Sequence, residues 1–172
     1  MKDPKSVKQG KKNRAAGGIF ELRVRKDLEE KGWIVDKWSN NVEFGKMHNT
    51  KVGGNTDGEI RTITDGKLIP AKRKYAGPGR PMAIGTGFPD FIAFRPMSCS
   101  TCFARMGDTS TENHKIIGCE VKSNGYLTPI EKQKCQWYLD NKIFKQIFIA
   151  RKTKVKNRVV IVYEDYTQKY GK

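Results

Sequence analysis

Apolar residues recur at helical spacing near the beginning of the chain. The run from Ala15 to Lys31 consists mostly of good helix formers, and Gly32 follows it where a left-handed cap would end a helix. Placed 100° apart, four apolar residues of this run form one stripe: Ala16, Phe20, Val24 and Leu28. Glu21 lies at the edge of the stripe. The pattern predicts a helix over 15–31 with one packed face and a carboxylate at its border.

Shorter apolar runs predict the strands of an α/β fold. Residues 33–38 favour a strand directly after the helix, because the β-branched residues Ile and Val lie at their centre. Two continuous apolar runs, 88–94 and 116–122, are typical of buried strands. Later in the chain, one or two further strands are expected from two more runs: 143–150 and 159–163.

A capping box marks the start of a second helix. Thr128 fits the N-cap, Pro129 the first helical position, and Glu131 the third, from which its side chain can reach back to the cap. The helix is expected to run to about Leu139. Its packed side is predicted to carry three residues: Ile130, Trp137 and Tyr138.

The first fourteen residues are basic and nearly free of apolar side chains. They contain six Lys and Arg residues against one acid, and we expect residues 1–14 to form a flexible arm. That arm either orders on a phosphate backbone or stays solvated. The remaining residues, 15–172, are enough for a single domain with one core.

Two further segments are expected to be insertions in that domain. Residues 41–84 are rich in Gly, Asn, Thr and Lys, and they are predicted to form a long surface excursion. Within it, residues 59–64 and 67–69 flank an Asp-Gly pair, which favours a short hairpin. The other insertion covers residues 96–114.

The charge of the chain indicates a polyanionic partner. Thirty-four Lys and Arg against eighteen Asp and Glu give a formal net charge of +16, which attracts nucleic acid. The candidate phosphate contacts lie in the arm and the long insertion: Lys11, Lys12, Arg14, Lys72, Arg73, Lys74 and Arg80. No apolar stretch is long enough for a membrane span or a signal peptide, so an intracellular, cytoplasmic location is expected.

The four cysteines do not form a convincing metal site. Cys99 and Cys102 have the spacing of a zinc knuckle, with His114 as a third candidate ligand. A second pair is missing, because strand parity points Cys119 into the core and Cys135 lies on a packed helix. Structural zinc is therefore not expected.

Three charged residues on two apolar strands suggest chemistry. Side chains alternate along a strand, so Glu120 and Lys122 point the same way, roughly 7 Å apart, while Cys119 and Val121 face the other side. Asp90 follows Pro89 in the neighbouring apolar run. Burying such groups costs several kcal/mol unless they are paired or bound to a metal.

Two acids that converge from neighbouring strands favour a divalent cation. Carboxylate oxygens suit Mg²⁺ or Mn²⁺, ions that keep waters and also bind phosphate oxygens. Hydrolysis of a phosphodiester needs such a metal, an activated water and a cation near the developing negative charge. Lys122 fits the last role. The alternative is structural, a buried ion pair with a strand-end cap.

Pro89 and Asp90, a spacer, and then Glu120, Val121 and Lys122 form the pattern PD, spacer, EVK. This pattern resembles the PD-(D/E)xK nuclease superfamily. The surrounding segments GFPDFIAF and IIGCEVKSNGYLTP, with a helix behind them, are similar to its VRR-NUC and archaeal Holliday junction resolvase branches. The resemblance covers residues 14–40 and 85–150.

The resemblance implies a restriction-endonuclease-like core in the order helix, strand, strand, strand, helix, strand, with a central mixed sheet flanked by helices. It implies that Mg²⁺ is held by Asp90, Glu120 and the backbone carbonyl of Val121. Glu21 would complete the acidic site, as an acid of the first helix does in the resolvases. In some branches a glutamine of the following helix joins the site, and Gln133 is the candidate here.

We therefore expect a Mg²⁺-dependent endonuclease that hydrolyses DNA and selects branched structures, as a Holliday junction resolvase does. Pairing of two copies as a homodimer would let two sites cut paired strands. Two alternatives stay open: a sequence-specific restriction or homing enzyme, and a nucleic-acid-binding module without catalysis. Metal-dependent nicking separates the last from the others.

Overall fold

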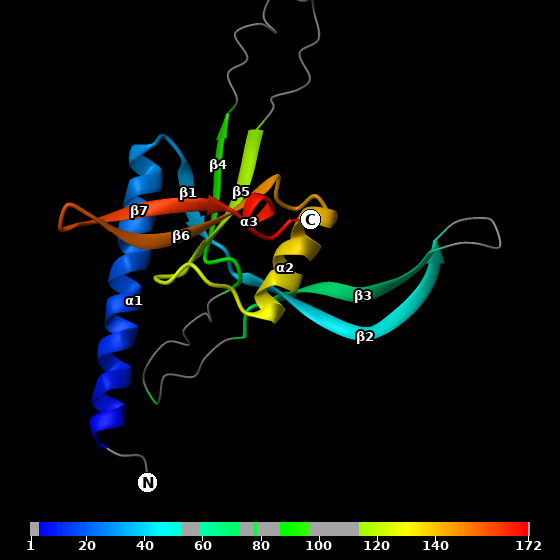
Figure 1. The fold of residues 1–172 in the computed structure, drawn as a ribbon, viewed down its shortest axis with the longest axis horizontal. Coiled ribbons are helices and arrows are strands. Elements are labelled where there is room, and N and C mark those ends of the chain that lie inside the picture. Colours follow the sequence, from blue (N-terminus) through cyan, green and yellow to red (C-terminus); the bar gives the residue numbers. More distant parts are fainter. Residues whose placement is uncertain (1–3, 53–58, 73–77, 79–86, 97–113, 172) are drawn as a thin grey trace, which may run out of the picture. The chain divides into compact units, whose positions relative to one another are not determined.

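The computed structural model describes residues 4–52, 59–72, 78, 87–96 and 114–171. It divides into two compact units, one of residues 1–38 and 89–172 and one of residues 39–88. The first unit is α/β, with a mixed five-stranded sheet and helices (Figure 1). An α/β class with a central mixed sheet was expected from the sequence, and the structure confirms it.

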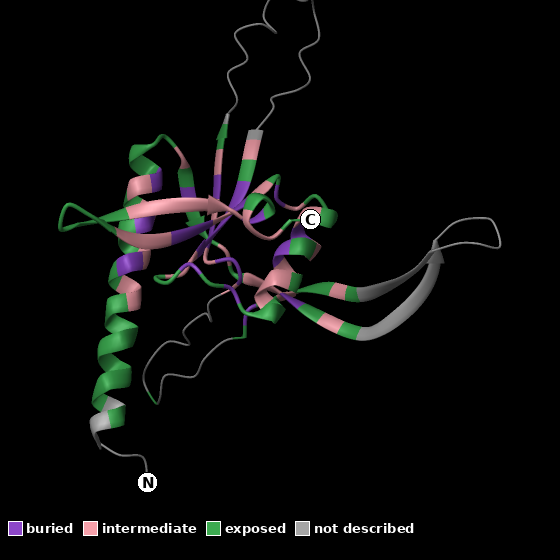
Figure 2. Ribbon diagram, viewed as in Figure 1, coloured by how far each residue is buried: buried purple, intermediate pink, exposed green. Residues whose placement is uncertain are grey.

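Helix α1 spans Pro4–Glu30 and has two unlike halves. Phe20, Val24 and Leu28 are buried, as the apolar stripe predicts, whereas Ala16 is exposed. Figure 2 shows the buried positions confined to the later half of the helix. Gly32 has a φ of +80°, and Trp33 N donates to Leu28 O at 3.1 Å, so the predicted left-handed cap is present.

The expectation of a flexible arm over 1–14 is wrong for residues 4–14, which are helical. Residues 8–16 are all exposed. The absence of an apolar face agrees with this exposure. It did not preclude a helix, because the packed later half supplies a nucleus from which helical turns propagate at little cost.

The five strands of the first unit are arranged in the order β1-β4-β5-β6-β7. Only β5 and β6 are parallel, and the helix between them makes the crossover that parallel neighbours need. The other neighbouring pairs are antiparallel. The strands span the following residues: β1 Ile34–Lys37, β4 Phe91–Pro96, β5 His114–Val121, β6 Gln146–Val155 and β7 Arg158–Asp165.

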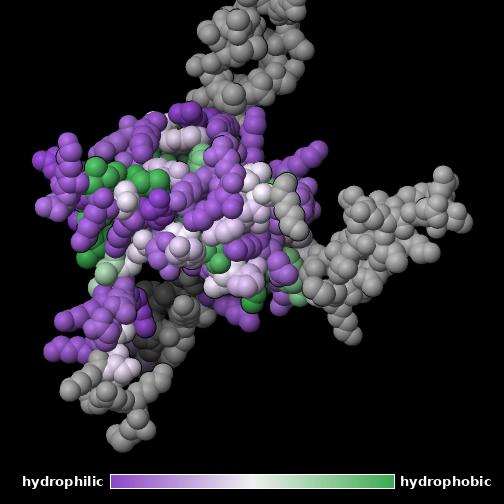
Figure 3. Space-filling view, viewed as in Figure 1, coloured by the Kyte–Doolittle hydropathy of each residue, from purple (hydrophilic) through white to green (hydrophobic). Residues whose placement is uncertain are grey.

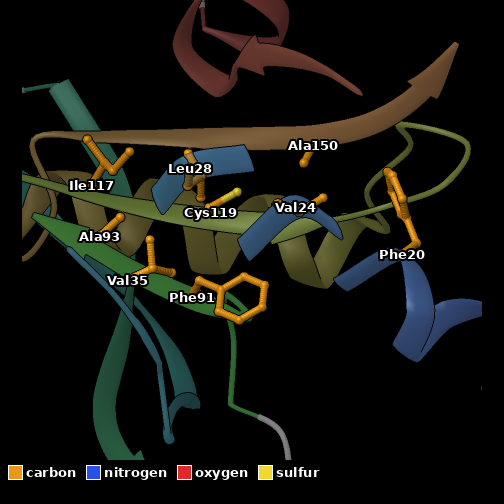
Figure 4. Packing of buried hydrophobic residues seen from close by; sticks show 9 residues of the cluster. All are labelled: Phe20, Val24, Leu28, Val35, Phe91, Ala93, Ile117, Cys119 and Ala150. Atoms are coloured by element: carbon orange, nitrogen blue, oxygen red, sulfur yellow. The ribbon is translucent and has the colours of Figure 1, made fainter. Parts of the chain in front are cut away.

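The core of the first unit lies between α1 and one face of this sheet. Residues from α1, β1, β4, β5 and β6 point toward one another there (Figure 4). Cys119 of β5 is fully buried in this cluster, as strand parity predicts. Its neighbour Glu120 therefore projects from the opposite face.

Helix α2, Pro129–Asp140, packs on that opposite face and begins with the predicted capping box. Cys135 and Tyr138 are fully buried, and Trp38 packs edge-on against Tyr138. Ile130 was expected on the packed side but remains 60% exposed. It lies about 140° around the helix from Cys135, on which the buried face is centred. A short helix, α3, Tyr166–Tyr170, ends the described chain.

The second unit is a long two-stranded hairpin in which β2, Asn40–Val52, pairs with β3, Glu59–Pro70. The short hairpin predicted inside residues 59–69 is wrong, because these residues form one strand. The Asp-Gly pair lies within β3, where Phe44 pairs with Gly66 and the register shifts before Met47. An irregularity of this kind uses the same residue types as a tight turn, so the local pattern was ambiguous.

Candidate active site

Asp90 and Glu120 come together at one end of the sheet, from neighbouring strands. Glu120 is the last residue but one of β5 and is 4% exposed, and Asp90 directly precedes β4. Glu120 Oε2 accepts a hydrogen bond from Asp90 N at 3.1 Å, and Asp90 Oδ2 accepts one from Val121 N at 3.0 Å. Each acid is thus held by the backbone beside the other. This reciprocal arrangement fixes both carboxylates without neutralising either.

A close approach between two chain segments keeps Asp90 in place. A Cβ atom added to Gly118 would lie 2.9 Å from Pro89 Cγ and 3.2 Å from the ring of Phe144. Gly118 therefore allows Pro89 to pack directly on β5, two residues before Glu120 on the same face. This contact places Pro89 and Asp90 beside the end of β5.

Burial raises the pKa values of Asp90 and Glu120. Desolvation, followed by repulsion from Asp90, raises the pKa of Glu120 from 4.5 to about 8. Desolvation, together with repulsion from Glu21, raises the pKa of Asp90 from 3.8 to about 6, although the hydrogen bond from Val121 N–H opposes this rise. Ionising both carboxyls costs free energy, because each is buried and each repels the other. A bound cation, in addition to the charged side chains nearby, would reduce that cost.

Lys122 is the cation of this cluster. Its Nζ lies 3.1 Å from Glu120 Oε1 and 2.6 Å from Glu131 Oε1. Burial alone would lower the pKa of Lys122, but its hydrogen bonds to the two glutamates outweigh burial and raise that pKa. The predicted placement of Glu120 and Lys122 on one face is thus confirmed, and Lys122 stays protonated there.

Glu131 is a site residue that the sequence analysis missed. Its Oε2 accepts from Thr128 N at 2.8 Å, completing the capping box, while its Oε1 accepts from Lys122. Partial burial would raise the pKa of Glu131, but the hydrogen bonds from Lys122 and Thr128 prevail and lower it. The capping pattern located the residue, although it gave no sign of the second contact.

Gln133, the expected helix residue of the site, is exposed. It is two residues beyond Glu131, about 200° around α2 from the face that contacts Lys122. The structure does not bring Gln133 to the cluster, and the residue of α2 that contacts Lys122 is Glu131.

Glu21 approaches the same end of the sheet from α1. It is partly buried and lies 3.4 Å from Lys37 Nζ of β1, and both side chains act electrostatically on Asp90. Of the candidate site residues, Glu21, Asp90, Glu120 and Lys122 thus gather at one end of the sheet.

The donors present fit a hard divalent cation only in part. Among the described residues, no three His, Cys, Asp or Glu side chains are grouped tightly enough to enclose a metal. Asp90 and Glu120 offer two carboxylates, and backbone carbonyls, waters or a substrate phosphate would have to complete the shell. Magnesium is commonly held in this way, by one or two carboxylates with several waters retained.

The predicted phosphate contacts are divided between the two units. Lys11, Lys12 and Arg14 are exposed on the first half of α1, where Figure 3 shows a hydrophilic surface. Lys72 is exposed in the second unit. The remaining candidates lie outside the described residues, as do the cysteines of the second insertion: Arg73, Lys74, Arg80, Cys99 and Cys102.

Comparisons with known proteins give no match to a family model, a curated protein or a solved structure. In the described part of the chain, no helix combines the length and apolar character that crossing a membrane requires.

Proposed function

We propose that this chain is a metal-dependent DNA endonuclease that hydrolyses phosphodiester bonds and prefers branched or otherwise distorted DNA. The observation that carries the proposal is the convergence of Asp90, Glu120 and Lys122 at one end of the sheet. A purely structural ion pair would need one acid and one base. Here two carboxyls with raised pKa values, Asp90 and Glu120, lie together, and the lysine that contacts Glu120 is also engaged by Glu131, which leaves room for a further cation.

Asp90, Glu120 and the carbonyl of Val121 are the residues that would hold Mg²⁺ or Mn²⁺. When bound, such an ion would polarise the phosphoryl group and make a water more acidic. The protein's own part is to keep both carboxylates fixed by the reciprocal hydrogen bonds of Asp90 and Val121 N–H. Metal binding also requires both carboxyls to lose their protons, so it is favoured by rising pH.

Lys122 and Glu131 supply the remaining chemistry. Lys122 is protonated and directed by two carboxylates, so that it can stabilise negative charge that develops on the phosphoryl group. Glu131 fixes the ammonium from the first turn of α2, which is itself capped by Thr128. Glu131 is therefore a positioning residue in this proposal.

The order of elements supports the resemblance to the PD-(D/E)xK superfamily. Without the separate hairpin, the chain runs α1, β1, β4, β5, α2, β6, the order of the restriction-endonuclease-like core that the resemblance implies. We propose that fold for the first unit, with β7 as an additional edge strand. In the same proposal Glu21 corresponds to the acid that the resolvases carry in their first helix.

The proposed substrate follows from charge and from the resemblance. A formal net charge of +16 favours DNA over neutral or cationic substrates, and the exposed basic half of α1 offers phosphate contacts. Contacts of this kind read backbone and shape rather than base sequence, which suits a structure-selective enzyme.

The test is incubation of the purified chain with Mg²⁺ and, side by side, a four-way junction, a flap, a linear duplex and a supercoiled plasmid. We expect Mg²⁺-dependent incision near the branch point and no incision in EDTA. Binding of all four DNAs without any incision would favour a non-catalytic binding module. Cutting of the linear duplex at one sequence would favour a sequence-specific enzyme.

A further inference from the structure

A hollow of about 280 Å³ lies on the α1 side of the sheet end that carries Asp90. It is lined by six residues of α1, β1 and β4: Gly18, Glu21, Leu22, Arg25, Lys37 and Phe91. Lys37 pairs with Phe91 across β1 and β4, and Phe91 follows Asp90 in the chain. Trp38 N, next to Lys37, donates to Asp90 O at 3.1 Å. The hollow thus adjoins the acid cluster through the backbone.

The chemistry of the hollow is mixed. Leu22, which is 68% exposed, contributes apolar surface, and the buried ring of Phe91 lies beneath the hollow. Arg25 and Lys37 provide two cations against the single acid Glu21, so the lining carries a net charge of +1. Arg25 is already engaged by Glu29 at 2.9 Å. Lys37, whose side chain is 58% exposed and whose contact to Glu21 is long at 3.4 Å, is the cation most available to a ligand.

We propose that this hollow receives one unpaired nucleotide of the DNA strand, next to the phosphodiester that is cut. The apolar side chain of Leu22, above the buried ring of Phe91, contacts the base or sugar, and Lys37 contacts the adjoining phosphate. A volume of about 280 Å³ is near the small end of ligand sites, about 300 Å³, and is too small for a base pair. The inference rests on the proposed function and explains why branched DNA, which offers unstacked nucleotides, would be preferred.

The substitution Gly18→Leu tests the hollow by filling it. A Cβ atom at Gly18 meets nothing within 4 Å, so a side chain can begin there without a clash, and leucine favours the helix more than glycine does. Gly10→Leu is the matched control, because a Cβ atom at Gly10 also meets nothing within 4 Å and Gly10 does not line the hollow.

A second pair of variants covers the case in which Gly18→Leu perturbs the helix. Leu22→Glu places a carboxylate in the hollow, and Ile19→Glu makes the same change of charge on the same helix outside the lining. Both residues are more than half exposed, at 68% and 56%, so neither change buries a charge in the core.

The experiment measures binding of two duplexes in Ca²⁺, which are identical except that one carries a single unpaired 2-aminopurine nucleotide. We expect the wild-type chain to bind the duplex with the unpaired nucleotide about tenfold more tightly than the fully paired duplex. Binding should also change the fluorescence of the 2-aminopurine. Gly18→Leu and Leu22→Glu should abolish this preference, whereas Gly10→Leu and Ile19→Glu should keep it.

Equal affinity of the wild-type chain for both duplexes would overturn the inference, as would a preference that survives both Gly18→Leu and Leu22→Glu. These outcomes are distinct from a failure of the proposed function. If the wild-type chain shows the preference in Ca²⁺ but cuts neither duplex in Mg²⁺, the nucleotide site would stand and the proposed nuclease activity would be refuted.

Discussion

The two faces of the sheet differ at the end where Asp90 lies. On the α2 face, Lys122 is held by Glu120 and Glu131 at 3.1 Å and 2.6 Å and is only 27% exposed in its side chain. On the α1 face, Lys37 contacts Glu21 at 3.4 Å, the one ion pair it forms among the described residues, and its side chain is 58% exposed. A lysine fixed by two carboxylates is preorganised for charge that develops at one point, whereas a loosely held lysine can follow a flexible substrate. We therefore propose that the α2 face carries the chemistry and the α1 face the recognition of DNA.

The largest expected effect separates the two lysines directly. Lys122→Met should lower the rate of DNA cleavage by about a thousandfold with little change in DNA affinity, because it removes an interaction made in the transition state. Lys37→Met should lower affinity by about tenfold or less and leave the rate at saturating DNA nearly unchanged. Single-turnover cleavage and a binding titration in Ca²⁺ measure the two quantities. Equal losses of cleavage rate in both variants would contradict the division between a catalytic Lys122 and a DNA-binding Lys37.

The buried acids should make the metal-free chain less stable as pH rises. A folded-state pKa raised above the ordinary value means that the folded form binds the proton more tightly, so its contribution to stability is complete at low pH. That contribution is lost as pH rises from 4.5 through about 8, the ordinary and the raised pKa of Glu120. The expected loss is several kcal/mol, measured by thermal unfolding in EDTA.

Glu120→Gln and Mg²⁺ provide the controls for this pH effect. The variant has no carboxyl at this position, so its unfolding midpoint should change much less over the same pH range. Mg²⁺ should stabilise the wild-type chain more at pH 8 than at pH 5, because binding requires the ionised carboxyls. An equally steep pH dependence in the variant would contradict the assignment to Glu120.

A smaller effect is expected from Glu131, which both caps α2 and positions Lys122. Glu131→Gln should lower the cleavage rate by about 10- to 100-fold and shift its pH profile, since the ammonium loses one of its two carboxylates. Thr128→Ala is the matched control. It removes the cap at a cost of about 1 kcal/mol while keeping the contact between Glu131 and Lys122. If Thr128→Ala lost as much cleavage rate as Glu131→Gln, the role of Glu131 would be to stabilise α2 and not to position Lys122.

The smallest effect concerns the exposed half of α1. Replacement of Lys8, Lys11 and Lys12 by Gln keeps the helix and removes three charges far along the chain from the acids. The slope of log affinity against log salt concentration should flatten by up to about 2.7, because each phosphate contact contributes about 0.9. Metal affinity should not change. An unaltered slope would exclude this half of the helix from DNA binding.

Local patterns predicted the elements that position the acids. The alternation of side chains correctly separated Glu120 and Lys122 from Cys119, because Cys119 lies on the face of β5 that packs against α1. The spacing of Phe20, Val24 and Leu28 predicted the packed face of α1. The capping box at Thr128 predicted where α2 begins, because all its determinants lie within four residues.

What the sequence could not provide depends on contacts between distant residues. The hydrogen bond from Lys122 to Glu131 forms because the turn after β5 places the start of α2 against the sheet. No local sequence pattern predicts that placement. The pairing of β2 with β3 is likewise nonlocal, so an Asp-Gly signal inside β3 was mistaken for a turn. The hollow beside Lys37 depends on three elements meeting at one point.

The most direct test of the account compares the wild-type chain with Asp90→Asn on one four-way junction in Mg²⁺. Asn keeps the size of the side chain and removes the charge that a metal would need. The account predicts incision by the wild-type chain, a loss of about a thousandfold or more in the variant, and closely similar junction affinities in Ca²⁺. Incision at the wild-type rate by Asp90→Asn would contradict the central claim.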